Sequence, residues 1–92
     1  MSFKTGDLLV TKGINQRVTK DAPFSSFIMT TFSRYMVRDW GDLCEEDIAM
    51  NDLAVKNGDD RILARYNNEE GDIYIITEWD RSVTTILFPS EY

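Results

Sequence analysis

Histidine is missing from this 92-residue sequence, and cysteine occurs only once, as Cys44. Without histidine, the most common general base and the most common metal ligand of proteins are both unavailable. The sequence also lacks the P-loop, the G-x-G-x-x-G pattern and the G-x-S-x-G pattern, which would indicate phosphate binding or nucleophilic catalysis. These absences predict a protein that is not an enzyme and that uses no cofactor and no metal ion.

A single cysteine cannot form an internal disulfide bond, which is typical of a reducing compartment. No apolar run approaches the length of a membrane span, and the first residues lack the basic start and apolar stretch of a secretory signal. We therefore expect a soluble, cytoplasmic protein that does not contact membranes. The chain length predicts one domain over residues 1–92 with a single core.

Hydrophobic periodicity predicts an α+β fold with the order β-α-α-β-β-β, in which two helices pack on one face of an antiparallel sheet. The first strand, residues 8–11, is expected at an edge of the sheet and is followed by a loop over residues 14–20. The last three strands, residues 61–66, 73–78 and 83–88, are separated by turn-rich segments at 67–72 and 79–82 and should form a meander.

The first helix is predicted to begin at an N-cap, Asp21, which precedes a proline in the first turn. Large apolar side chains recur on one side of this helix at helical spacing, as expected where a helix covers a core. We predict that Phe27, Ile28 and Phe32 are buried together with Ile75 of the sheet.

A second helix is predicted to start at a capping box formed by Asp42 and Glu45. It should run to about Lys56 and end where Gly58 adopts a left-handed conformation. Acidic residues in its first turns are favourable because the N-terminal end of the helix dipole is positive.

Two polar residues of this second helix, Asp47 and Asn51, fall inside its apolar arc. A buried carboxylate needs a partner, so Asp47 should meet Arg34, Arg38 or backbone donors, or else lie at a rim that solvent reaches. We expect the paired, structural arrangement, although the pattern leaves open whether Asp47 and Asn51 serve the fold or a functional pocket.

Charge is distributed unevenly along the chain. Residues 1–38 carry six Lys and Arg against two acids, whereas residues 39–92 carry four against fourteen, for a net charge of −6. The acids are dense from Asp39 to Asp60, and grouped carboxylates can imitate nucleic-acid phosphates towards a basic groove. Ordinary solubility is the competing interpretation. The predicted partner-binding residues are Asp42, Glu45, Glu46, Asp52, Asp59 and Asp60.

Three stretches of the sequence, residues 6–15 (GDLLVTKGIN), 39–47 (DWGDLCEED) and 79–92 (WDRSVTTILFPSEY), resemble small plasmid-related proteins that mobile elements and phages of Gram-positive bacteria carry. The resemblance brings no catalytic motif and assigns no residue a role. It implies a context in which small acidic proteins often disarm host defence, as anti-CRISPR and anti-restriction proteins do.

Charge and context together predict a non-enzymatic inhibitor that binds a host defence nucleoprotein at its nucleic-acid-binding surface. Direct nucleic-acid binding is not expected of the acidic half, because like charges repel. The alternative is an accessory or regulatory protein of plasmid maintenance that acts through oligomerisation or through DNA contact by the basic N-terminal third. The identity of the partner, the defence system and the formation of a homodimer stay open.

Overall fold

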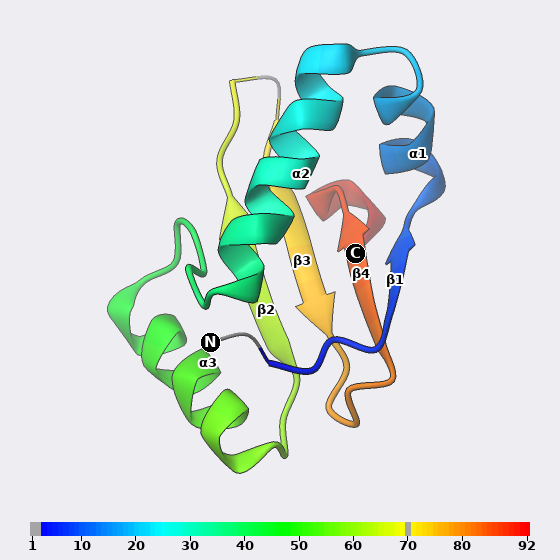
Figure 1. Ribbon diagram of the computed structural model, residues 1–92. Coiled ribbons are helices and arrows are strands. Elements are labelled where there is room, and N and C mark those ends of the chain that lie inside the picture. Colours follow the sequence, from blue (N-terminus) through cyan, green and yellow to red (C-terminus); the bar gives the residue numbers. More distant parts are fainter. Residues whose placement is uncertain (1–2, 70) are drawn as a thin grey trace.

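The computed structural model describes residues 3–69 and 71–92, and it confirms an α+β fold (Figure 1). The described residues form one mixed sheet with the strand order β1-β4-β3-β2. Position 70, within the predicted turn at 67–72, lies outside the described residues. The elements along the chain are β1 (Asp7–Val10), α1 (Lys12–Val18), α2 (Ala22–Met36), α3 (Glu45–Asn57), β2 (Ile62–Tyr66), β3 (Ile73–Thr77), β4 (Val83–Leu87) and the 3-10 turn η1 (Pro89–Glu91).

Strand β1 lies at an edge of the sheet, as predicted, but the expectation of an antiparallel sheet is wrong for this strand. It runs parallel to β4, with Leu8 opposite Thr84 and Val10 opposite Ile86. A parallel pair requires a long crossover connection, and the whole of the intervening chain supplies it here. The last three strands form the predicted antiparallel meander.

Helix α1 replaces the loop predicted for residues 14–20. Its N-cap is Thr11, whose side chain accepts the N–H of Ile14. The carboxylate of Glu91 binds the same helix end, because it accepts the Thr11 hydroxyl at 2.7 Å and the Gly13 N–H at 3.1 Å. A Cβ atom at position 13 would lie 2.7 Å from that carboxylate, so glycine permits the approach. This short helix is therefore capped by a residue far along the chain, and its Ile14 is buried in the core.

The three hydrogen bonds to Glu91 generate a pH prediction. The Thr11 hydroxyl and the N–H groups of Phe88 and Gly13 lower the pKa of this carboxyl below its usual range. The stabilisation is thus present above the ordinary glutamate pKa and is lost as the pH falls through the lowered value. We expect the Gly13 amide resonance to titrate with a midpoint below the usual glutamate range. Glu91→Gln should abolish the titration and speed amide exchange in α1, whereas an ordinary midpoint would contradict the cap.

Helix α2 starts at the predicted N-cap, since the Asp21 side chain accepts the Phe24 N–H at 3.0 Å. The most buried line of the helix is formed by Phe24, Ile28, Thr31 and Tyr35. The two predicted core residues beside this line, Phe27 and Phe32, are only partly buried and pack against the core from its flanks. They lie to either side of the contact line because the buried residues follow each other at intervals of three and four.

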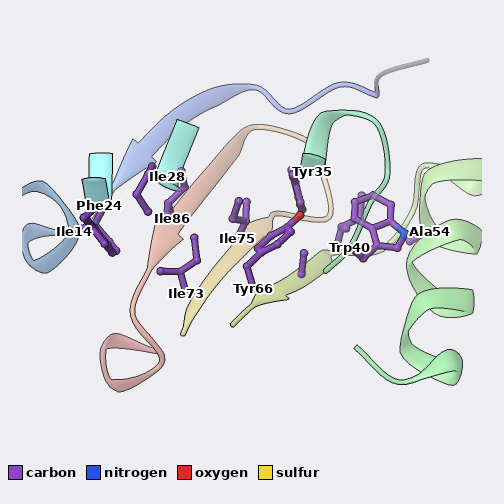
Figure 2. Packing of buried hydrophobic residues seen from close by; sticks show 12 residues of the cluster. Ile14, Phe24, Ile28, Tyr35, Trp40, Ala54, Tyr66, Ile73, Ile75 and Ile86 are labelled. Atoms are coloured by element: carbon purple, nitrogen blue, oxygen red, sulfur yellow. The ribbon is translucent and has the colours of Figure 1, made fainter. Parts of the chain in front are cut away.

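The apolar core extends from Ile14 of α1 to Trp40 and to Ala54 of α3 (Figure 2). Ile75, as predicted, is fully buried in it, together with Ile28. At the last residue pair of the β3–β4 ladder, the sheet presents polar groups to α2. The Tyr35 hydroxyl lies 2.6 Å from that of Thr77, which in turn lies 2.7 Å from that of Thr84.

The hydrogen bonds in this chain of hydroxyl groups all donate in the same sense, from Tyr35 towards Thr5. Thr84 donates its only hydroxyl proton to the C=O of Thr5 at 2.7 Å, so it accepts from Thr77, and Thr77 accepts from Tyr35. Burial raises the pKa of Tyr35 well above its usual value, which keeps the donor protonated. The chain joins α2, β3, β4 and the segment before β1.

Two neighbouring threonines of β4 test this arrangement. Thr84→Val removes both hydrogen bonds of a buried hydroxyl and leaves the Thr77 hydroxyl proton without an acceptor and the Thr5 C=O without a donor, which should lower the free energy of unfolding by about 1–3 kcal/mol. The control is Thr85→Val, on the opposite face of the same strand, where the hydroxyl makes no hydrogen bond within the described residues. Denaturant unfolding should show little change for this control, and equal losses for both variants would contradict the role of the chain.

Candidate functional site

Helix α3 begins at Glu45 with Cys44 as its N-cap, so the predicted capping box at Asp42 is wrong. Asp42 instead binds the end of β2: its N–H donates to the C=O of Arg65 at 2.7 Å, and its carboxylate accepts the N–H of Asn67 at 2.8 Å. The end of the helix is as predicted, with Gly58 in the left-handed conformation at φ 67°.

The outer edge of strand β2 is covered by α3 and by the segment before it. Asn51 binds Leu63 twice, because its amide group donates to the Leu63 C=O at 2.8 Å and accepts the Leu63 N–H at 3.4 Å. Further along the edge, the Arg65 N–H donates to the C=O of Trp40 at 3.3 Å. Helix α3 therefore lies beside the edge of the sheet (Figure 1), which corrects the prediction that both helices pack on one face.

The two polar residues in the apolar arc of α3, Asp47 and Asn51, differ in burial and in bonding. Asn51 is buried and serves the fold, as described above. Asp47 is exposed and makes no hydrogen bond or ion pair within residues 3–69 and 71–92, so the prediction that it is paired inside the fold is wrong. Arg34, one of its expected partners, binds Asp39 at 2.7 Å instead, and this bond lowers the pKa of the Asp39 carboxyl. Asp47 thus lies at the solvent-reached rim.

Substitutions at Asn51 and Asp47 test whether only Asn51 contributes to stability. Asn51→Ala leaves the N–H and C=O of Leu63 without their partner, and we expect a loss of about 1–3 kcal/mol in the free energy of unfolding. Hydrogen exchange at the Leu63 amide should accelerate at the same time. Asp47→Asn should change stability by no more than about 0.5 kcal/mol, as is usual for an exposed group. A large loss for Asp47→Asn, or none for Asn51→Ala, would reverse the assignment.

The predicted partner-binding acids divide into two groups. Glu45 and Glu46 are exposed in the first turn of α3, and Asp59 and Asp60 are exposed in the loop after it. Two others are exposed but have structural bonds: Asp52 accepts the Trp40 indole N–H at 2.9 Å, and Asp42 holds the end of β2. Sequence reasoning missed these bonds because neither partner is within ten residues.

A shallow hollow of about 260 Å³ lies between α3 and the start of β2. A second hollow adjoins it along α3 and shares Met50 and Asp60 with the first. Their outer rim contains two large apolar side chains, Met50 and Leu53, which are 62% and 56% exposed. The first hollow is lined by Leu43, Asp47, Met50, Asn51, Asp60, Arg61 and Leu63.

Arg81 fixes the β3–β4 turn against the C-terminal end of α3. Its guanidinium donates to the C=O of Ala54 at 2.9 Å and to the C=O of Asp60 at 2.6 Å. It also donates to the C=O of Trp79 at 3.3 Å, so this turn lies at the same end of the molecule as Asp60. Trp79 is 64% exposed there. This contact could not be predicted from the sequence, because its partners lie on other elements and turn residues are commonly exposed.

We define the α3 surface as the exposed carboxylates of Glu45, Glu46, Asp47, Asp59 and Asp60 together with the exposed side chains of Met50 and Leu53. Large apolar side chains surrounded by charged residues are common in protein interfaces, where the centre is apolar and the rim polar. Carboxylates on the rim select basic partners and speed the encounter with them. Such a surface is suited to binding another protein.

No protein-family model matches the chain, and no curated protein or solved structure matches it either. Among residues 3–69 and 71–92, no three side chains of the metal-binding types gather where they could hold an ion. None of the helices formed by these residues combines the length and apolar character that crossing a membrane requires.

Proposed function

We propose that this protein is a non-enzymatic inhibitor from a mobile element, and that its α3 surface binds a host defence nucleoprotein where that protein binds nucleic acid. The observation that carries the proposal is the exposure of Glu45, Glu46, Asp47, Asp59 and Asp60 on one helix and the loop after it. These carboxylates are free to meet cations, since none of their side chains forms an ion pair within residues 3–69 and 71–92.

The chemistry of the α3 surface favours a protein over a nucleic acid as its partner. A nucleic-acid backbone would be repelled by the carboxylates, whereas a groove lined with Lys and Arg would be attracted. Met50 and Leu53 add an apolar centre that a basic groove can desolvate. A few well-packed residues near the centre of an interface commonly contribute most of its binding energy, while the surrounding contacts exclude water.

The basic N-terminal third offers weaker support for the alternative, DNA contact in plasmid maintenance. Two of its cations already contact the fold: Arg17 lies over the Phe24 ring at 4.4 Å, and Arg34 binds Asp39. The resemblance of residues 79–92 to proteins of mobile elements is compatible with both functions. Identifying what the protein binds, a defence protein or DNA, distinguishes them.

A pair of charge reversals tests the proposed function. We expect Glu46→Lys to weaken binding to a CRISPR effector or restriction protein captured from a Gram-positive host by about tenfold at low salt, because a carboxylate at the rim acts on encounter and on salt dependence. The control is Glu69→Lys, which changes the net charge equally but lies in the β2–β3 turn, away from α3 (Figure 1). Both variants should stay folded, since exposed charges contribute little to stability and a lysine in the first turn of α3 should cost at most about 1 kcal/mol against the helix dipole.

Competition distinguishes the two candidate functions. Duplex or guide nucleic acid should displace the wild-type protein from its partner, and added salt should weaken the complex. Binding that is insensitive to salt and to nucleic acid would rule out the proposed mode. A gel shift of plasmid DNA by the isolated protein, abolished by removing basic residues of the N-terminal third, would instead establish the alternative.

A further inference from the structure

The two edges of the sheet differ in the protection of their backbone groups. Helix α3 and residues 40–42 bond the outward groups of β2, as described above. On β1, the N–H groups of Asp7 and Thr11 donate inward to the C=O groups of Ser82 and Ile86. Alternate residues point the opposite way, so the N–H and C=O groups of Leu8 and Val10 point outward. No hydrogen bond from residues 3–69 or 71–92 reaches them.

The side chains of β1 also leave this edge unprotected. Leu8, Leu9 and Val10 are 47%, 49% and 42% exposed, although each is strongly apolar. Edge strands of monomeric proteins are usually protected by a charge, a proline or a bulge within the strand, or by a covering segment. Asp7, the first residue of β1, carries the only charge in the strand; residues 8–10 contain no charge, proline or bulge, and no element lies outside β1 in Figure 1.

We propose that a second copy of this chain pairs with β1 in antiparallel orientation, about a two-fold axis that passes through Leu9. In this register Leu8 of each copy lies opposite Val10 of the other, and the pair exchanges both of its N–H···O=C bonds. All four outward groups of each strand are then satisfied. The two sheets become one continuous sheet with an apolar ladder along the join.

Only this register suits the side chains. Centring the axis on Leu8 would place Asp7 opposite Leu9, and centring it on Val10 would place Leu8 opposite Lys12, which already belongs to α1. Centring it on Leu9 places Leu9 against itself and Asp7 opposite Thr11 of the other copy, one residue away from Lys12. Both of these charged residues are exposed, and neither forms an ion pair within residues 3–69 and 71–92.

The distribution of charge over the molecule permits two copies to pair through β1. The carboxylates of the α3 surface lie beyond β2, at the opposite edge of the sheet from β1. Two copies joined through β1 therefore keep these surfaces far apart, and exposed charges beyond a Debye length are largely screened at physiological salt. The near edge carries Asp7 at the start of β1 and Lys12 just after its end, one charge of each sign.

Sedimentation over a concentration series tests the pairing. The wild-type chain should pass from 10.7 kDa to twice that mass as its concentration rises. Leu9→Lys and Leu9→Glu should each stay at 10.7 kDa, since each places like charges opposite one another at the axis. An equimolar mixture of the two variants should regain the double mass. A wild-type chain that is monomeric at millimolar concentration, or a dimer that neither variant disrupts, would overturn the proposal.

A cross-link tests the register independently. Residues facing each other in a non-hydrogen-bonded antiparallel pair have Cα atoms about 4.5 Å apart, which suits a disulfide. In a Cys44→Ser background, which removes the exposed native thiol, Leu9→Cys should oxidise to a covalent dimer. Leu8→Cys should cross-link far less, because its counterpart is displaced along the strand. Equal yields from positions 8 and 9 would reject the register, and folding of each variant is checked by its thermal transition.

Discussion

The chain of hydroxyl groups from Tyr35 to the C=O of Thr5 constrains the whole of this small fold. Hydroxyl groups buried on a sheet must be hydrogen-bonded, and here each threonine depends on the next. A slip of one residue between β3 and β4 would move Thr84 to the other face and leave Thr77 without its acceptor. The chain therefore fixes the register of the meander and the position of α2 over it, and the apolar side chains pack around that arrangement.

The position of the acidic surface follows from a second constraint, the protection of the β2 edge. Asn51 attaches α3 to this edge through polar bonds, so that the helix covers the strand while packing only a narrow apolar strip, mainly Ile48, Ala54 and Val55. The rest of its circumference is left for solvent. This explains how one helix can serve the sheet and also present carboxylates and large apolar side chains on its outer side.

Local signals in the sequence predicted much of this structure. The Asp21 cap, the left-handed Gly58, the meander and the exposure of Glu45, Glu46, Asp59 and Asp60 each depend on neighbouring residues. Helix α1 and the parallel pairing of β1 depend on β4 and Glu91, at the other end of the sequence. The roles of Asp42, Asp52 and Asn51 also require partners on other elements. Periodicity alone cannot assign such residues, and for this reason Asp47 and Asn51 could not be told apart.

The parallel contact of β1 with β4 also sets an order for folding during synthesis. Residues 7–18 cannot complete their hydrogen bonds until residues 83–91 have left the ribosome, because both β4 and Glu91 are needed. Contacts so distant in sequence form late, since the loop that they close is long. Until residues 83–91 have been made, the nascent chain therefore carries residues 8–10 as an unpaired apolar segment, which chaperones and neighbouring copies on the same polysome can bind.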